Sequence, residues 1–245
     1  RGVGKTWMSC IIALSLTRSE QHEIEIGNWQ PKHRAGGLYL DAEMNNRELQ
    51  DNLKALCLPL PPEDAENPLL VLSQHDFAQE FEQQINLGNK KHREAIYGLV
   101  QQDKRIKVLI LDNVAALTPG IVENVKEDWD PVNQWLISLR HLGTAVILIH
   151  HAGKGGQQRG TSGREDAMDN IIKLELPKSY DSAKDYAWFK ISFEKARNLQ
   201  PGDSKKPFTL RIIEHPTIEG GLTFETGEDE KPGQHKGNRI MAAII

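Results

Sequence analysis

Short apolar runs alternate with longer amphipathic segments through the first two thirds of the chain. Residues 37–41, 108–112 and 145–150 are such runs, and each ends in a polar side chain. Residues 69–72 form a further short apolar run. Runs that are apolar on both faces are typical of parallel strands covered by helices on either side. The pattern therefore predicts an α/β fold built on a mostly parallel sheet.

Helical periodicity fills the segments between these runs. Residues 7–16 fit a helix that follows a glycine turn, and Asn45 is placed to cap a second helix, with apolar positions on one face at Leu49, Leu53 and Leu56. A polar helical region extends to about residue 102. A further helix is expected to start at residues 130–131, where an aspartate and a proline stand in favoured N-terminal positions, and to stop at Gly143.

The pattern changes after His150. Residues 151–164 are rich in glycine and polar side chains. Four alternating segments follow, which we expect to extend the sheet as antiparallel strands: 170–176, 187–193, 208–213 and 221–224. We thus predict a core domain over residues 1–225, a charged, glycine-rich linker over 226–238, and the start of a truncated helix over 239–245.

Composition narrows the function classes. Acidic residues outnumber basic ones by 34 to 30, so any contact with nucleic acid must come from a local basic cluster. No apolar run approaches the roughly 18 residues of a membrane span, and we expect no membrane partner. Cys10 and Cys57 lie in apolar patterns without a C-x-x-C pair, which predicts free thiols in a reducing, cytoplasmic compartment.

The chain opens with the second half of a phosphate-binding loop, G-x-x-x-x-G-K-[ST]. The first glycine of that motif, and the strand leading into it, would precede Arg1. In such a loop backbone N–H groups cradle phosphate oxygens, the lysine reaches the β- and γ-phosphates, and the hydroxyl binds Mg²⁺. The alternative is a plain glycine turn before a helix, with an exposed Lys5. The expected ATP-binding residues are Gly2, Val3, Gly4, Lys5, Thr6 and Trp7.

Polar side chains stand at or just after the ends of three of the predicted strands. Asp112 ends one strand at the carboxyl edge of the sheet, where ligands of open parallel sheets bind, and is the candidate to support Mg²⁺ together with the loop threonine. Glu43 is the candidate general base for water. Asp41 is its rival, but lies nearer the strand body, where a structural hydrogen bond is the simpler role. His150 is placed to sense the γ-phosphate. The alternative for Asp112 is an aspartate that only caps the end of its strand. The alternative for His150 is a histidine that packs against the protein or faces solvent.

These motifs, taken in order, resemble the RecA-like ATPases, and among them the hexameric replicative helicases of the DnaB and plasmid RepA types. The matching stretches are GVGKT at 2–6, LYLDAEM at 38–44, VLILDN at 108–113, ILIHHAGKGGQQRGTSGREDAMDN at 147–170 and FEKARN at 193–198. The resemblance covers a motor core, and the amino-terminal primase-binding domain of a DnaB-type protein is not visible.

The resemblance also implies roles for individual residues. Glu43 would be the catalytic glutamate, and Asp112 the aspartate that supports the metal. Lys195 and Arg197 would form the Lys-x-Arg pair inserted into a neighbouring subunit's ATP site, where a cation stabilises the transferring phosphoryl group. The alternative is a pair of exposed cations at a strand end. ATP sites between subunits would require a homo-oligomer, expected to be a hexameric ring.

The segment after His150 would face single-stranded DNA in the family, through the cations Lys154, Arg159 and Arg164. The alternative is a surface loop that happens to lack acids. Asp169, just beyond it, is expected to have a structural role. The first hypothesis is thus a ring-forming, ATP-hydrolysing motor on single-stranded DNA, a replicative-type helicase of a plasmid, phage or mobile element. A filament-forming recombination or repair ATPase and a nucleotide-gated regulatory or scaffold protein are the alternatives.

Overall fold

The computed structural model describes residues 4–19, 24–65, 67–122, 125–150, 168–197, 205–228 and, as backbone alone, 238–243. Within these residues, nine strands form one sheet in the order β2-β1-β3-β4-β9-β5-β6-β7-β8. The first part of the sheet is parallel and consists of β1 (Gly36–Asp41), β2 (Leu69–Ser73), β3 (Ile106–Asp112) and β4 (Ala145–His150). These are the strands predicted from the apolar runs.

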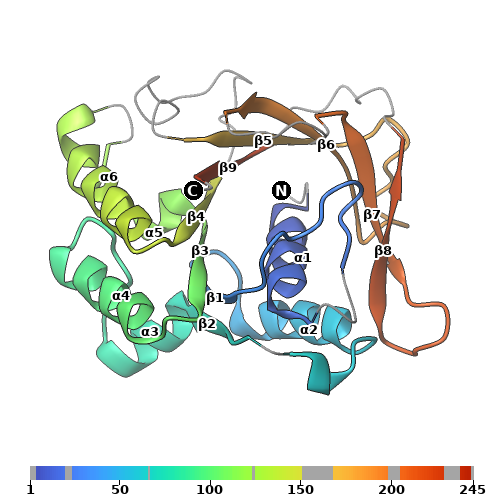
Figure 1. The fold of residues 1–245 in the computed structure, drawn as a ribbon, viewed down its shortest axis with the longest axis horizontal. Coiled ribbons are helices and arrows are strands. Elements are labelled where there is room, and N and C mark those ends of the chain that lie inside the picture. The colour runs from blue at the N-terminus through green and yellow to red at the C-terminus, as the bar shows by residue number, and fades with distance from the viewer. Residues whose placement is uncertain are drawn as a thin grey trace.

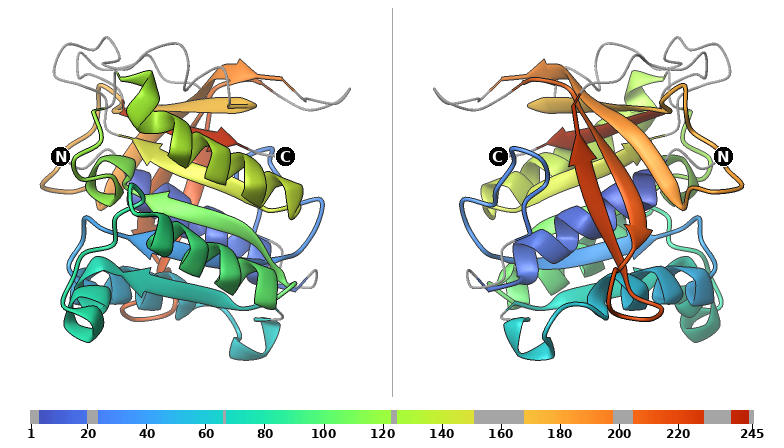
Figure 2. Two further views of the ribbon diagram at one scale, coloured as in Figure 1. Left: turned by 90° about the vertical axis from the view of Figure 1, so that its left-hand side faces the viewer. Right: turned by 90° about the vertical axis from the view of Figure 1, so that its right-hand side faces the viewer.

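The second part of the sheet is antiparallel. It consists of β5 (Asn170–Glu175), β6 (Ala187–Ala196), β7 (Phe208–Glu214) and β8 (Leu222–Gly227). These strands curve around α1 (Lys5–Thr17), so that this helix lies between the parallel strands and the strands β7 and β8 (Figure 1; Figure 2, right). The predicted fold class, a parallel α/β sheet with antiparallel strands added on the carboxyl-terminal side, is confirmed.

Helices cover both faces of the parallel strands. On one face lie α1 and α2 (Asn46–Cys57), followed by the short 3₁₀ helix η2 (Pro62–Asp64). On the other lie α3 (Gln74–Phe81), α4 (Lys90–Gln102), α5 (Val114–Leu117) and α6 (Lys126–His141), as Figure 1 shows. Asn45 caps α2 as predicted, since its side chain accepts the backbone N–H groups of Arg47 and Glu48.

Two apolar clusters, one on each face of the sheet, form the core. The first joins α1 to the strands on both sides of it, through residues such as Met8, Ile110 and Phe189. The second joins α4, α5 and α6 to the opposite face, through residues such as Leu109 and Leu139. The alternation of side chains along β3 places neighbouring residues, Leu109 and Ile110, in different clusters. Burial on both faces explains why β3 is apolar at nearly every position.

One predicted helix boundary, the start of α6, is wrong. Helix α6 begins at Lys126, so Asp130 is not its cap and Pro131 lies inside the helix. Trp129 is 5% exposed and sits in the same cluster as Val132, and its burial extends the helix past the expected start. The expected polar helical region before residue 102 is divided into α3 and α4.

The helix predicted for residues 239–245 is also wrong. Residues Asn238–Ala243 form β9, which pairs antiparallel with both β4 and β5. A short apolar run does not by itself distinguish a helix from a buried strand. Here the edges of β4 and β5 supply backbone partners on both sides, and these decide for the strand. The expected linker is shorter than 226–238, because β8 continues to Gly227 and β9 starts at Asn238.

None of the described helices combines the length and the apolar character that crossing a membrane requires.

Candidate functional site

The parallel strands bring the predicted acids together at their carboxyl ends. Asp41 and Asp112, the last residues of β1 and β3, stand opposite each other in the register of the two strands. Both side chains are fully buried. The amino end of α1 lies against this edge, because the Thr6 side chain contacts Asp112. The convergence of Lys5, Thr6, Glu43 and Asp112 is therefore a property of the fold, as the motifs predict.

Gly4 sets the start of α1. Its φ is 82°, in the left-handed region that glycine adopts at little cost. A Cβ at this position would lie 2.3 Å from the Phe189 ring, so the site has no room for a side chain. The turn is thus packed directly against β6. Gly2 and Val3 lie outside the described residues, and Trp7 packs half-buried against the first core cluster.

Two hydroxyl groups hold Asp112. The Thr6 hydroxyl donates to Asp112 Oδ2 at 2.9 Å, and the Tyr39 hydroxyl donates to the same oxygen at 2.7 Å. Tyr39 is fully buried, and its oxygen also lies 2.9 Å from Ser9 Oγ. Ser9 Oγ also lies within hydrogen-bond distance of the carbonyl oxygens of Lys5 and Thr6, at 3.1 and 3.0 Å. These bonds tie the first two turns of α1 to β1 and β3.

The other oxygen of Asp112, Oδ1, is buried and has no hydrogen-bond partner among the described residues. Burial, opposed by the bonds from Tyr39 and Thr6, raises the pKa of Asp112 above its ordinary value. A buried carboxylate oxygen of this kind fits a hard cation or its bound water. The Thr6 hydroxyl hydrogen is already used, so its lone pairs are available to a metal. The residues present thus fit Mg²⁺, with Thr6 and Asp112 as the groups that would hold it.

Lys5 is buried beside the two acids, with 6% of its surface exposed. Desolvation lowers its pKa from 10.5, while the charges of Glu43 and Asp112 act in the opposite direction. Bringing a cation this far out of water is costly unless anions surround it. A lysine in this position is suited to bind a polyanion, which would add further negative charge beside the ammonium group.

Glu43 lies on the turn after β1, with its side chain exposed at the edge of the sheet. Its Oε2 accepts a hydrogen bond of 2.6 Å from Nδ2 of Asn113. Glu43 is thus oriented by the residue that directly follows Asp112, and the two strand ends are linked through their side chains. The peptide bond between Asp112 and Asn113 is cis.

Asp41 has the structural hydrogen bond expected of it. Its Oδ2 accepts the backbone N–H of Met44 at 3.1 Å, which shapes the turn that carries Glu43. Burial, and then the neighbouring charge of Asp112, raise the pKa of Asp41 to about 7. Its Oδ1 is buried without a hydrogen-bond partner among the described residues.

His150 ends β4, the strand next to β3, and is 8% exposed. It is therefore buried, which removes the solvent-facing alternative for this side chain. Lys154, Arg159 and Arg164, the predicted DNA-contacting cations, lie outside the described residues.

Lys195 lies near the end of β6 and Arg197 directly follows that strand, four strands away from β3 in the sheet. Strand β5 runs parallel to β4, because both pair antiparallel with β9, and β6 runs antiparallel to β5. Ala196 stands opposite Asn170, which β9 connects to the row of Ile147, and Lys195 is connected in the same way to the row of Leu148, so the end of β6 is level with the middle of β4. In the sheet order, the three strands β4, β9 and β5 lie between β3, which carries Asp112, and β6, which leads to this pair.

A bulge shapes the end of β6. Ile172 stands opposite Phe193, but Ile171 stands opposite Lys195, so Glu194 is the extra residue. Beyond it, the backbone N–H of Arg197 donates to the carbonyl of Asp169 at 3.0 Å.

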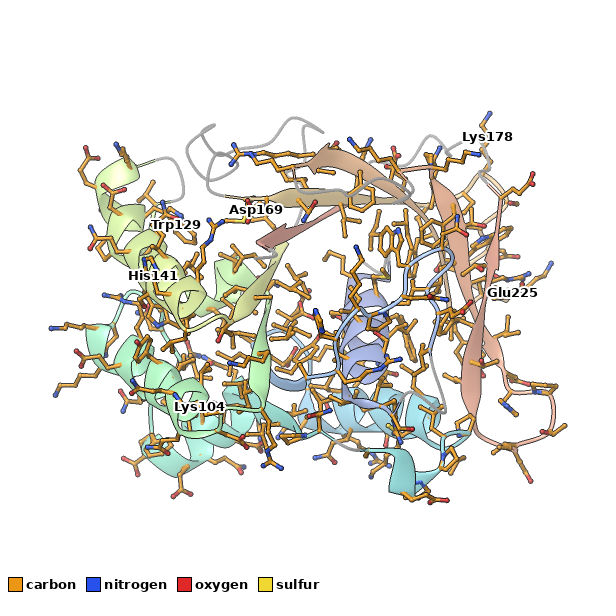
Figure 3. The ribbon with its side chains drawn as sticks, viewed as in Figure 1. Lys104, Trp129, His141, Asp169, Lys178 and Glu225 are labelled. Carbon is orange, nitrogen blue, oxygen red and sulfur yellow. The ribbon has the colours of Figure 1, made fainter. Side chains whose placement is uncertain are left out.

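The side chain of Asp169 is buried 3.5 Å from Arg140 of α6 (Figure 3). Asp169 therefore ties β5 to α6 and to the end of β6, and this agrees with the structural role expected of it.

Sequence reasoning missed Tyr39, Ser9 and Asn113. Tyr39 is a polar side chain inside an otherwise apolar strand, and Ser9 lies one helical turn beyond the loop threonine; both signals were present. Asn113 stands three residues before the Ala116 N–H that it caps, a common N-terminal pattern. Their partners, however, come from other elements, and only the folded chain shows them.

Comparison with known proteins agrees with this site. A family sequence model described as an AAA domain matches residues 1–157, a range that includes Lys5, Glu43, Asp112 and His150. No similar sequence was found among curated proteins. Among solved structures, the crystal structure of the RadB recombinase is similar over 80% of this chain and 80% of its own, with 16% sequence identity and a TM-score of 0.46. The match extends over more than half of the sequence, so the chain belongs to the AAA domain family, a family of P-loop ATPases.

Proposed function

We propose that this chain is the ATP-hydrolysing core of a homo-oligomeric motor that acts on single-stranded DNA, a replicative-type helicase of a plasmid, phage or mobile element. The observation that carries the ATPase part is the convergence of Thr6 and Tyr39 on one oxygen of Asp112, with Lys5 and Glu43 beside them. This arrangement has a cation for phosphate, a hydroxyl and carboxylate for metal, and a second carboxylate for water.

The chain's own residues divide the work of hydrolysis. The turn at Gly4 and the amino end of α1 bind the phosphates through backbone N–H groups. Lys5 neutralises charge on the β- and γ-phosphates, and Glu43 orients the attacking water and accepts its proton. Thr6 and Asp112 would hold Mg²⁺, which, when bound, neutralises phosphate charge. Burial of Lys5 and Asp112 strengthens these electrostatic interactions by excluding water.

The position of Lys195 and Arg197 supports sites shared between subunits. Three strands separate them from the strand of Asp112, and we propose that a second copy of the chain supplies the pair that completes each site. A guanidinium contributed in this way would stabilise the transition state and make hydrolysis depend on assembly. A closed ring satisfies this requirement at every interface, and we propose six subunits, as in the helicases that the motifs resemble.

The DNA part of the proposal rests on the sequence between β4 and β5. Lys154, Arg159 and Arg164 lie in a stretch without carboxylates, suited to phosphate contacts that do not read sequence. His150, at the end of β4, connects that stretch to the nucleotide edge along the chain. We propose that it transmits the state of the γ-phosphate to the DNA-contacting segment.

The decisive experiment measures ATP turnover with and without single-stranded DNA at several protein concentrations, together with displacement of a labelled strand from a forked duplex. The proposal predicts turnover that rises steeply with protein concentration, stimulation by DNA and strand displacement. Stimulation without displacement, with filaments in negative-stain images, would favour a recombination-type ATPase. Activity independent of DNA would contradict the motor.

A further inference from the structure

Asn113 connects the two strand ends that carry the acids of the site. It directly follows Asp112 at the end of β3, is 5% exposed, and is the N-cap of α5. Its Oδ1 accepts the backbone N–H of Ala116 at 3.0 Å, and its Nδ2 donates to Glu43 Oε2 at 2.6 Å. The Asn113 side chain thus provides a hydrogen-bond partner both for a backbone N–H at the start of α5 and for the carboxylate of Glu43, on the turn after β1.

The cap fixes the orientation of this amide. A carboxamide has one accepting and one donating end, and only the oxygen can accept the N–H of Ala116. If the amide were turned over, its NH₂ group would face that N–H, and its oxygen would face the Glu43 carboxylate. Both contacts would be repulsive. The backbone of α5 therefore directs an N–H donor at Glu43.

A fixed hydrogen-bond donor would hold the Glu43 side chain in one conformation. Its side chain is exposed on a turn, and fixing a glutamate in one rotamer costs conformational entropy. A base must lie within hydrogen-bond reach of the water that it activates, and small displacements cost much of the rate. Because Asn113 and Asp112 are consecutive, the same rigid strand end sets the position of both carboxylates.

We propose that Asn113 is a positioning residue for ATP hydrolysis, which holds Glu43 in the geometry that activates water. This inference rests on the proposed function. The structure supports it through a buried amide whose orientation is set independently of Glu43.

The test separates the two bonds of Asn113. Asn113→Ser and Asn113→Asp each keep an oxygen that can cap α5, but neither donates an amide N–H to Glu43. We expect kcat for ATP to fall by roughly tenfold in Asn113→Ser, and further in Asn113→Asp, where a second carboxylate faces Glu43. KM and the affinity for a non-hydrolysable ATP analogue should change by less than about twofold, because Glu43 acts on water rather than on nucleotide binding. The melting temperature of Asn113→Ser should stay near that of the wild type.

A double-mutant cycle checks that Asn113 acts through Glu43. In a Glu43→Gln background, followed by single-turnover kinetics, Asn113→Ser should cause no further loss. An equal loss in both backgrounds, an unchanged kcat, or a faster Asn113→Ser enzyme would each overturn the inference while leaving the ATPase proposal in place. If the wild-type protein hydrolyses no ATP under any condition, both proposals fail.

Discussion

At the scale of single residues, the two oxygens of Asp112 have different surroundings. Oδ2 accepts the hydroxyls of Thr6 and Tyr39, whereas Oδ1 is buried without a partner among the described residues. The hydroxyls fix the rotamer of the carboxylate, so that the remaining oxygen is presented in one direction. Thr6 and Tyr39 lie on different elements, and the aspartate is therefore oriented by both α1 and β1.

Removing one of these donors should weaken the metal site. We expect Tyr39→Phe to cost about 1–3 kcal/mol of unfolding free energy, because the buried carboxylate loses a hydrogen bond. The Mg²⁺ concentration for half-maximal ATPase activity should rise several-fold. Tyr97→Phe, on α4, is the matched control. Identical Mg²⁺ titrations and melting curves for the two variants would show that Tyr39 does not orient Asp112.

The raised pKa of Asp41 predicts that the stability of the folded protein depends on pH. Its pKa in the folded protein is about 7, against an ordinary 3.8, so the native state retains a proton that the unfolded chain has lost. The contribution of Asp41 to stability therefore falls as the pH rises from about 4 to about 7, and the loss is complete above that range. Asp41→Asn resembles the protonated form and can still accept the Met44 N–H.

In EDTA, we expect this variant and the wild type to differ little in unfolding free energy near pH 4. The variant should become the more stable by on the order of 1 kcal/mol or more at pH 8. Chemical denaturation at several pH values measures the difference. A difference in unfolding free energy that stays constant from pH 4 to pH 8 would contradict the raised pKa of Asp41.

Residues close in sequence to a strong motif were predictable, and those that act across elements were not. Lys5, Thr6 and Asp112 follow from spacing and from the rule that ligands bind at the carboxyl edge. Tyr39 could be recognised only as an odd polar residue in an apolar strand, because its partners lie 30 and 73 positions away in sequence. Such pairing depends on register, which the sequence pattern alone does not specify.

At the scale of elements, the start of α1 and the neighbouring strand β6 fit closely. Gly4 stands against the Phe189 ring, so the phosphate-loop turn is held by the antiparallel part of the sheet. The parallel strands were predictable from their apolar runs, whereas β9 was not. A short apolar segment adopts whichever structure its neighbours complete, and here β4 and β5 offer two open strand edges.

Adding one methyl group at this turn should disrupt the site. Gly4→Ala brings both a strained left-handed backbone and an overlap with Phe189, each of which costs about 1–3 kcal/mol. We expect at least tenfold weaker nucleotide binding and a lower melting temperature. Gly98→Ala is the control: its Cβ would meet nothing within 4 Å, and it should stabilise α4 by about 0.5–1 kcal/mol. Equal behaviour of the two variants would be evidence against close packing at Gly4.

At the scale of the whole molecule, the acids of the site and the Lys195–Arg197 pair lie in different parts of the sheet. Lys5, at the start of α1, lies beside Glu43 and Asp112 at the carboxyl ends of β1 and β3, whereas Lys195 and Arg197 lie at the end of β6, four strands away from β3. We propose that the pair completes the site of a neighbouring copy of the chain, as the resemblance of the motifs predicts.

Mixing two inactive variants tests this sharing. Lys5→Ala lacks a nucleotide site but keeps Arg197, and Arg197→Ala has the reverse defect. We expect each to be inactive alone, and a mixture to recover part of the ATPase activity, because some interfaces join an intact site to an intact Arg197. Mixing Lys5→Ala with Glu43→Gln, both defective at the same edge, should recover nothing. No recovery in the first mixture would contradict shared sites.

The central claim is that the amino end of α1, with Asp112 and Glu43, binds the triphosphate of ATP. The most direct measurement is the equilibrium binding of a fluorescent, non-hydrolysable ATP analogue, with Mg²⁺, to the wild type, to Lys5→Ala and to Lys104→Ala. Lys104 is an exposed lysine near the opposite ends of the strands (Figure 3). The account predicts equal affinity for the wild type and Lys104→Ala, and at least tenfold weaker binding to Lys5→Ala. Equal binding to all three proteins would contradict it.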